Sequence, residues 1–407
     1  MDIREMKKET IYSLYIMNML LAPSLLADTI DPVIVVENIK SVFPGSHLYP
    51  AYALSNNDNS LLRVEGNAVV ETGVVGNDII KVIPSSFRSF AALTASNEIL
   101  TITDSTDNIK ITNVTDLQAI QGGFAALRSD GTVVTWNDQV PPDQCQTHLK
   151  NVKRIITSPE GYGAVALHGD GTISAWSYDI CSGFSVKEIN AIDVAVGTYG
   201  FTVLDYRGTA LQYPYDTKHV MYNMNHIERV VSGNNYGLSL NNELINCGGT
   251  TVNANGKSSL QVSTASGTGM MMLQMSDGTV TQAHCYGSTL NSLSDMTLRS
   301  LHNIKSIVSN YNGFTALDTS GNLFTWGGYN SEYNNKQLNE IRGNIAFIVP
   351  MMNSFAALKY DGTVIAWGEQ MDIENGSQRR LNNIVGVYPS TGKYLALSKE
   401  GKLYSFN

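Results

Sequence analysis

The stretch 355-FAALKYDGTVIAWG-368 is the unit from which this chain of 407 residues is built. Apolar residues alternate on both sides of an Asp-Gly pair. Similar stretches surround four other leucines: Leu127, Leu167, Leu317 and Leu397. Apolar alternation interrupted by Asp-Gly is a signature of a β-hairpin. We expect a two-residue type I′ turn at each pair, because Gly and Asp tolerate the positive φ that this turn requires.

The unit recurs along the chain with a period of about 38 residues, which indicates a repeat protein. The apolar residue before each expected turn is Leu54, Leu93, Leu127, Leu167, Leu204, Leu240, Leu273, Leu317, Leu358 or Leu397. All four tryptophans lie nine residues after one of these leucines: Trp136, Trp176, Trp326 and Trp367. Six units also carry an aromatic residue three positions before the leucine. We interpret both aromatic series as packing between units, because aromatic rings bury large apolar areas.

Each unit has room for at least three short strands, since a β-branched run such as Ile304 to Val308 precedes most hairpins. About 38 residues leave little space for a crossover helix, so the sheets should be antiparallel. A sheet this small must stack on its neighbours, which favours a β-propeller. We therefore predict one all-β domain over residues 29–407, a propeller of about ten antiparallel blades. Fewer blades with an N-terminal cap is the alternative. Val33 to Val36 should pair beside the last hairpin and close the ring.

The A-L-x-x-D-G-x-V-x-x-W-G pattern resembles the repeat of the regulator of chromosome condensation superfamily, over residues 39 to 407. The resemblance is strongest around Leu127, Leu167, Leu317 and Leu358. It implies a propeller without shared catalytic residues, and the compact repeats are most similar to secreted bacterial propellers that inhibit β-lactamases. Nuclear members that exchange nucleotide on a small GTPase carry a Gly-Gln-Leu-Gly-type segment after Trp-Gly. Only 326-WGGYNSEYNNKQL-338 faintly echoes that segment, which argues against exchange activity.

Composition excludes several classes of function. The formal net charge is −9, and no Lys/Arg cluster stands out beyond Arg4 to Lys8, so nucleic acid is not an expected partner. The seven histidines occupy unrelated repeat positions, and neither a nucleophile elbow nor a phosphate-binding loop occurs. Turn chemistry explains the Asp-Gly pairs without calcium. These pairs begin at Asp130, Asp170, Asp277 and Asp361. We expect no enzyme activity, no cofactor and no metal.

The cysteines and the N-terminus bear on the compartment. Cys145, Cys181, Cys247 and Cys285 show no metal-binding spacing. They are free thiols, or staples between successive repeats in an oxidising compartment. Residues 1–28 form a leader or a helix. The apolar run Ile11 to Ala27 is short for a stable membrane span and resembles the core of a signal peptide, although acidic residues balance the basic ones before it. We expect an exported or extracellular protein, or a cytoplasmic one if this run docks as a helix.

Function should lie on the segments that differ between repeats. Two linkers, 213–226 and 328–343, are rich in Tyr, Met and Asn. Tyr and Met are enriched at protein interfaces. The residues that we expect to bind a partner are Tyr215, Met221, Tyr222, Met224, Tyr329 and Tyr333, whereas the repeat position of Tyr213 indicates packing. The alternative for both linkers is that they cap blade edges. We expect a non-catalytic module that binds another protein, in a bacterial secreted, surface, toxin or virulence role. A lectin that binds glycans and a guanine nucleotide exchange factor-like effector are the alternatives.

Overall fold

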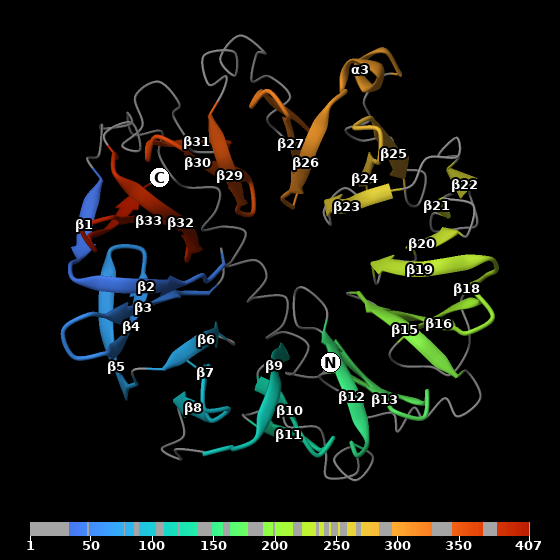
Figure 1. Cartoon of the computed structure of the whole chain (residues 1–407), viewed down its shortest axis with the longest axis horizontal. Coiled ribbons are helices and arrows are strands. Elements are labelled where there is room, and N and C mark those ends of the chain that lie inside the picture. The colour runs from blue at the N-terminus through green and yellow to red at the C-terminus, as the bar shows by residue number, and fades with distance from the viewer. Residues whose placement is uncertain are drawn as a thin grey trace, which may run out of the picture.

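The computed structural model shows ten small antiparallel sheets that follow one another around a ring in chain order (Figure 1). It describes residues 32–46, 49–76, 78–84, 89–102, 110–120, 123–136, 149–157, 163–177, 190–197, 200–214, 222–232, 236–239, 244–245, 251–252, 259–265, 270–284, 295–311, 313–327, 344–368 and 381–406. We number the sheets as blades 1 to 10, starting with β2. The predicted β-propeller is confirmed, and the alternative with an N-terminal cap is excluded because blade 1 is a full member of the ring.

The first five blades contain three or four strands each. Blade 1 has β2 (Ile39–Phe43), β3 (Ala51–Ser55), β4 (Ser60–Glu65) and β5 (Ala68–Val75). Blade 2 has β6 (Ile79–Pro84), β7 (Phe90–Thr94) and β8 (Ile99–Ile102). Blade 3 has β9 (Val114–Ile120), β10 (Gly123–Arg128) and β11 (Val133–Trp136); blade 4 has β12 (Val152–Thr157), β13 (Gly163–His168) and β14 (Ile173–Ser177). Blade 5 has β15 (Ala191–Val196), β16 (Gly200–Asp205), β17 (Ala210–Pro214) and β18 (Tyr222–Met224).

The other five blades repeat the plan. Blade 6 has β19 (Ile227–Ser232), β20 (Tyr236–Ser239), β21 (Leu244–Ile245) and β22 (Thr251–Val252); blade 7 has β23 (Ser259–Ala265), β24 (Met270–Met275) and β25 (Val280–His284). Blade 8 has β26 (Ile304–Ser309), β27 (Gly313–Asp318) and β28 (Leu323–Gly327); blade 9 has β29 (Ile345–Pro350), β30 (Ser354–Lys359) and β31 (Val364–Gly368). Blade 10 has β32 (Ile384–Ser390), β33 (Lys393–Ser398), β34 (Leu403–Phe406) and β1 (Val33–Val36). The one helix in the described residues, α3 (Asp295–Ser300), connects blades 7 and 8 and crosses over no sheet.

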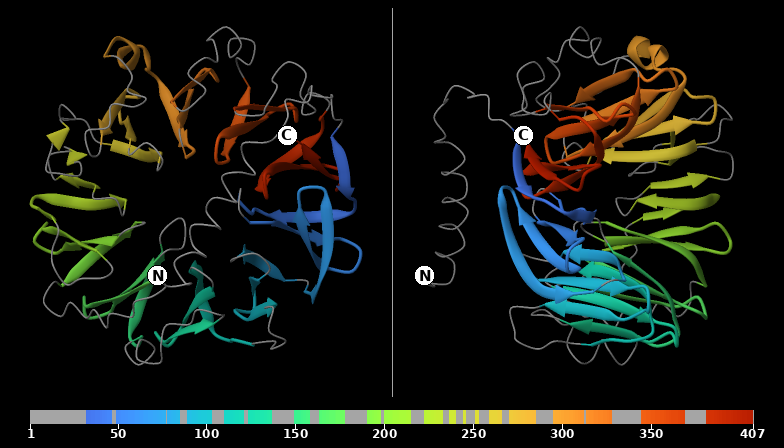
Figure 2. Two further views of the ribbon diagram at one scale, coloured as in Figure 1. Left: turned by 180° about the vertical axis from the view of Figure 1, so that it is seen from behind. Right: turned by 60° about the vertical axis from the view of Figure 1, so that its left-hand side comes forward.

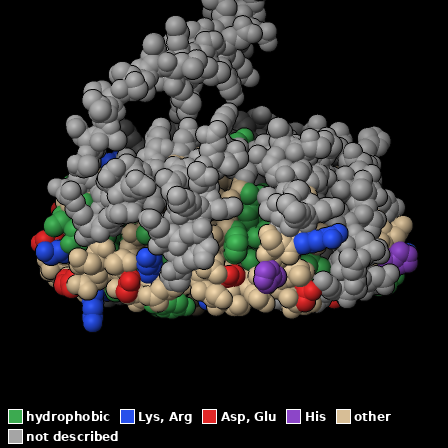
Figure 3. All heavy atoms as spheres, turned by 90° about the horizontal axis from the view of Figure 1, so that it is seen from above, with side chains coloured by type: hydrophobic (Ala, Val, Ile, Leu, Met, Phe, Trp, Pro, Cys, Tyr) green, Lys and Arg blue, Asp and Glu red, His purple; other side chains and the backbone are tan. Residues whose placement is uncertain are grey.

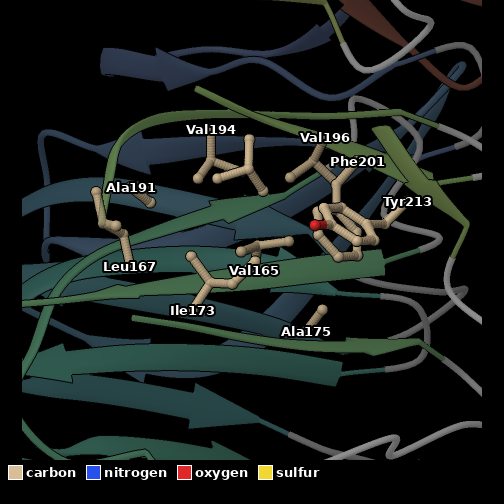
Figure 4. Close-up of a cluster of buried hydrophobic side chains, with 10 residues drawn as sticks. Val165, Leu167, Ile173, Ala175, Ala191, Val194, Val196, Phe201 and Tyr213 are labelled. Carbon is tan, nitrogen blue, oxygen red and sulfur yellow. The ribbon is translucent and has the colours of Figure 1, made fainter. Parts of the chain in front are cut away.

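The core lies between the blades. Every described side chain of β3, β7 and β13 is buried, because each middle strand is covered by a neighbouring blade on both faces. Figure 4 shows one such interface, in which Val165 and Leu167 of blade 4 pack against Val194 and Phe201 of blade 5. The F-A-A-L pattern follows from this arrangement. In blade 3, Phe124 faces blade 2 and Leu127 faces blade 4, so successive side chains serve two different interfaces.

The aromatic series lies where the repeat predicts. Trp136 pairs directly opposite Phe124, and their rings stack with centroids 5.2 Å apart. The same cross-strand stack recurs at Phe201–Tyr213, Phe314–Trp326, Phe355–Trp367 and Tyr394–Phe406. These rings are buried, which confirms that they are packing residues and that Tyr213 belongs with them. Trp367 adds an inter-blade hydrogen bond, since its Nε1 donates to Thr325 Oγ1 of blade 8 at 3.2 Å.

The hairpin turns are not the type I′ turns that we predicted. At Asp130-Gly131, the Gly131 amide donates to the Arg128 carbonyl (3.0 Å) and the Arg128 amide donates to the Thr132 carbonyl (2.9 Å). Gly131 has φ +80°, whereas Asp130 is not in the positive-φ region, so the hairpin has a three-residue loop with one left-handed residue. Asp130 Oδ1 instead accepts hydrogen bonds from the Thr132 hydroxyl and amide, which hold the pKa of Asp130 below its ordinary value. Asp, Gly and Thr thus each have a separate role in the turn.

These turn glycines also join consecutive blades. The Gly131 carbonyl accepts a hydrogen bond from the amide of Val152, the first strand residue of blade 4, at 2.8 Å. Equivalent bonds of 2.8–2.9 Å join Gly171 to Ala191, Gly208 to Ile227, Gly278 to Ile304, Gly362 to Ile384 and Gly401 to Ile39. The residue before the first strand is left-handed in eight blades: Asn38, Asn113, Asn151, Asn190, His226, Asn303, Asn344 and Asn383. Asn tolerates this conformation better than most residues, which explains a repeated asparagine that our sequence analysis missed.

The ring closes between blades 10 and 1. β1 pairs antiparallel with β34, so the predicted pairing of Val33 to Val36 beside the last hairpin is confirmed. The Ser390 hydroxyl donates to the Val64 carbonyl (2.7 Å) and accepts from the Ala51 amide (3.2 Å), while Val36 and Leu397 pack on one core cluster. From behind, the blue strands of blade 1 lie directly beside the red strands of blade 10 (Figure 2). The first and the last described strands, β1 and β34, are therefore joined at the same seam.

Two predictions fall on residues that the structure does not describe. All four cysteines lie outside the described residues, as does the N-terminal segment 1–28. Among the helices that are described, none has the length and hydropathy needed to cross a bilayer.

Candidate protein-binding surface

The first strands form a series of sheet edges. Figure 1 shows β2, β6, β19 and β26 running from the outer rim toward the middle of the ring. In all ten blades, the pairing register shifts by one residue near the start of this strand, which marks a β-bulge. Bulges and charged side chains discourage edge-to-edge pairing with other chains. The first strands are therefore poor sites for strand addition, and recognition at them depends on side chains.

The third residue of the first strand carries charge in one sector of the ring. Lys81 Nζ lies 3.8 Å from Asp116 Oδ1 in the next blade, and Arg154 Nη2 lies 2.6 Å from Asp193 Oδ1. The charges on blades 2 to 5 therefore alternate in sign, and they pair across the interface of blades 2 and 3 and that of blades 4 and 5. Each Asp also accepts the amide hydrogen of the next residue, which orients its carboxylate. These pairs are partly exposed and contribute little stability, about 0.2–1 kcal/mol each.

The same repeat position is uncharged in blades 8 to 10. It holds Ser306, Phe347 and Gly386, and Phe347 is exposed. Val385, at the bulge of the adjacent first strand, is exposed as well. At this repeat position the ring thus has a charged sector, blades 2 to 5, and an uncharged sector, blades 8 to 10. Exposed apolar side chains at the bulge occur in both sectors, at Ile80, Ile192 and Val385.

Tyr311 and Met352 extend the uncharged sector toward the middle of the ring. They follow β26 and β29, and the Tyr311 amide donates to the Met352 carbonyl across the blade interface at 3.1 Å. Tyr311 is 43% exposed and Met352 is 40% exposed. Both belong to tight connections, because the Asn310 amide donates to the Gly313 carbonyl and the Met351 amide donates to the Ser354 carbonyl, each at 2.9 Å. The backbone that carries Tyr311 and Met352, two residue types common at protein interfaces, is therefore held by hydrogen bonds.

The adjoining blade 10 supports this backbone from behind. Ser354, two residues after Met352, is buried, and its Oγ lies 3.1 Å from the Tyr394 hydroxyl oxygen of blade 10. Burial raises the pKa of the Tyr394 hydroxyl above its ordinary value, so this hydroxyl keeps its proton in more alkaline solution than an exposed tyrosine does. We call Tyr311 and Met352, with this supporting backbone, the Tyr311–Met352 patch.

The side chains of the patch suit a contact surface. Within the described residues, no three His, Cys, Asp or Glu side chains gather in a way that would hold a metal ion. The patch itself offers a phenol and a thioether, which suit an apolar surface with a few polar groups. Figure 3 shows the ring from its edge, where Lys/Arg and Asp/Glu side chains are interspersed around a central group of hydrophobic ones. This mixture is unlike a one-sign surface that attracts a polyanion.

The residues predicted to bind a partner have different outcomes. The prediction for Met224 is wrong: it ends β18, is 6% exposed and packs with Leu204 and Ile227 between blades 5 and 6. The expected linker 213–226 continues as the fourth strand of blade 5, and a residue on that strand contributes to the core. Tyr222 begins the same strand, and its side chain is not described. Tyr215, Met221, Tyr329 and Tyr333 lie outside the described residues.

Tyr311 and Met352 were missed because we searched only the long linkers between repeats. Both lie in short connections within a repeat, after the first strand. A signal was present in the sequence: Asn310-Tyr311-Asn312 and Met351-Met352-Asn353 have the same Tyr, Met and Asn composition as the long linkers. That these two connections, about 40 residues apart, touch each other follows only from the ring.

No protein-family model matches the chain, and no curated protein is similar to it at a significant level. Solved structures resemble it at low identity. The computationally designed Ika8 protein is 14% identical over 81% of this chain and 96% of its own, with a TM-score of 0.38. The C-terminal WD40 domain of Sif2 is 13% identical over 92% and 98%, with a TM-score of 0.35. The CRINKLY WD40 ectodomain of the Arabidopsis thaliana receptor kinase ACR4 is 8% identical over 70% and 91%, with a TM-score of 0.34. These likenesses concern the fold alone. Membership of the regulator of chromosome condensation superfamily stays a prediction.

Proposed function

We propose that this protein is a non-catalytic β-propeller that binds another protein through the Tyr311–Met352 patch. One observation carries the proposal: a Tyr and a Met, each about two-fifths exposed, are joined across blades 8 and 9 by a backbone hydrogen bond of 3.1 Å. Exposed apolar side chains on a rigid backbone mark interaction sites, because binding does not have to order them first. A bacterial exported, surface, toxin or virulence-associated setting is part of the same proposal: the apolar run Ile11 to Ala27 supports export, and the resemblance of the repeats supports a bacterial setting.

The surrounding surface supports a protein partner. Phe347 and Val385 add exposed apolar area on blades 9 and 10, and no charged residue occupies the third first-strand position there. Protein interfaces have cores depleted in charge and enriched in aromatic residues and Met. The alternating charges of blades 2 to 5 lie elsewhere on the ring, where they favour one orientation of an approaching partner.

Site-specific photo-crosslinking tests the proposal. A benzophenone amino acid replaces Tyr311 in the full chain, and in a matched control it replaces Tyr360, which is 68% exposed in a hairpin turn of blade 9. We expect the variant with benzophenone at position 311 to give one crosslinked product of defined mass, and the variant with benzophenone at position 360 to give none. Met352→Asp should reduce the crosslink at least fivefold and leave the far-ultraviolet circular dichroism unchanged. Equal crosslinking at both positions, or no effect of Met352→Asp, would show that the patch is not the binding site.

A further inference from the structure

β5 is an unusual edge strand. With eight residues it is the longest strand of the described chain, and it is the last strand in the order of blade 1. The part of the chain that the structure describes places no strand beside its far edge. Figure 1 shows it at the outer margin of blade 1. Val70 is 44% exposed and Val75 is 65% exposed, so both ends of β5 carry β-branched side chains in contact with solvent.

The segment Ala68–Glu71 is regular, unlike the edges of the first strands. Its residues pair in unbroken register with Leu62–Glu65 of β4, and the irregularity comes only afterwards, around Gly73 with φ +77°. The first strands, by contrast, are bulged in every blade. The bulge of β5 thus lies beyond Ala68–Glu71 and Glu71 is the one charge on this segment, so four residues keep a regular register. A regular, partly β-branched edge is the kind of edge to which another strand adds.

The molecule already contains an example of strand addition in the neighbouring blade. β1, a four-residue segment of sequence VIVV, pairs with β34 and completes blade 10. It lies against β5, and Val36 of β1 and Val69 of β5 pack on the same core cluster. A short β-branched segment therefore suffices to extend a sheet at this seam, and the regular part of β5 has the same length.

Charge decides which kind of segment fits. Glu71 is the only ionisable residue of β5, it is exposed, and the described residues give it no ion pair. The nearby Glu65 is already paired with Arg63 at 3.4 Å. An opposite charge directly across a strand pair is favourable, whereas a like charge is not. The fitting segment carries Lys or Arg opposite Glu71 and β-branched residues beside Val70. A second copy of the chain offers no basic residue from β5 and brings a net charge of −9.

We propose that the free edge of Ala68–Glu71 binds an extended basic and β-branched segment of a partner protein by antiparallel strand addition. This site is on blade 1 and does not depend on the Tyr311–Met352 patch of blades 8 and 9. A four-residue pairing gives weak binding by itself, and the partner's contacts elsewhere add to it through effective concentration.

The probe is a fluorescein-labelled synthetic peptide, Thr-Val-Lys-Val-Thr-Val-Lys-Val, titrated with the full chain and followed by anisotropy. Two further peptides of the same sequence carry N-methyl groups on alternate backbone amides. One peptide is methylated along one hydrogen-bonding edge of the extended strand, and the other peptide along the opposite edge. We expect one N-methylated peptide to bind like the parent and the other to bind at least tenfold more weakly, because only one edge pairs with β5. Equal binding of both would overturn strand addition.

Protein variants locate the site. Val70→Lys should weaken binding about fivefold, whereas Val385→Lys, an exposed valine on the bulged strand β32, should leave it unchanged. Glu71→Lys should weaken binding of the Lys peptide and strengthen binding of a Glu-for-Lys peptide. Insensitivity to both β5 variants would contradict the assignment. If the peptide binds only to a chain that lacks residues 1–31, the protein's own N-terminal segment occupies the edge, which would refute a partner protein. Dimerisation of the chain through β5 would refute it as well.

Discussion

Replacing Gly362 by alanine should loosen the contact between blades 9 and 10. Gly362 has φ +80°, which costs an L-residue about 1–2 kcal/mol. An added Cβ would also lie 3.2 Å from the Ile384 nitrogen and 3.3 Å from the Asn383 Cα, both backbone atoms of the next blade. Relieving that contact stretches the hydrogen bond of 2.9 Å from the Ile384 amide to the Gly362 carbonyl, which contributes about 0.5–1.5 kcal/mol. We expect a total loss of about 1.5–3.5 kcal/mol.

Gly392→Ala is the matched control. Gly392 also has a left-handed φ, +65°, but no atom lies within 4 Å of its added Cβ. Its substitution should cost only the conformational part, about 1–2 kcal/mol. The assay is urea unfolding followed by tryptophan fluorescence and by circular dichroism, with coincident transitions required before free energies are compared. If the two variants lose the same free energy, the inter-blade role of the turn glycines is wrong.

Three further perturbations test other parts of the ring. Two truncated chains, one lacking residues 1–31 and one lacking residues 1–36, differ only by β1 and the residue before it. The shorter chain should have a free energy of unfolding about 2 kcal/mol lower, because it loses the packing of Val35 and Val36. Equal stability of the two chains would contradict closure of the ring by β1. Thr325→Val leaves the buried Trp367 Nε1 without its acceptor and the buried Thr315 hydroxyl without its partner, and should cost about 1–2 kcal/mol. Thr135→Val, at the same repeat position, removes a buried hydroxyl that has no partner and should be nearly neutral. A reversed order would refute the assigned bonds. Burial raises the pKa of Tyr52 and of Tyr394, so the folded state keeps protons that the unfolded state loses above about pH 10. The melting temperature should therefore be highest below that pH and fall as the pH rises above it. Tyr394→Phe should reduce this fall, and an unchanged dependence of melting temperature on pH would contradict the burial of the Tyr394 hydroxyl.

Much of the architecture was predictable because it depends on local periodicity. The recurrence of Trp136 nine residues after Leu127 and of Phe124 three residues before it was visible in the sequence, and it indicated two buried positions. Their direct pairing depends on the three-residue loop, because the predicted two-residue turn would have set Trp136 opposite Ala125. The strand Val33 to Val36 was predictable as the partner of the last hairpin because a short β-branched run at one chain end complements a hairpin at the other. Met224 shows the limit, because nothing in its linker distinguishes a short fourth strand from a loop.

The repeated antiparallel unit and the buried aromatic positions could be predicted from the sequence, since hydrophobic patterning acts within one hairpin, whereas the choice between ten blades and a smaller ring with a cap could not. What successive units share was visible only in the folded ring: the hydrogen bonds from the next blade to six of the turn glycines, the Arg154–Asp193 pair, the contact of Tyr311 with Met352 and the edge of β5 that no described strand covers. Those features join residues about 40 positions apart or depend on which edge a neighbour leaves uncovered. They arise from the curvature of the ring, which no single repeat encodes.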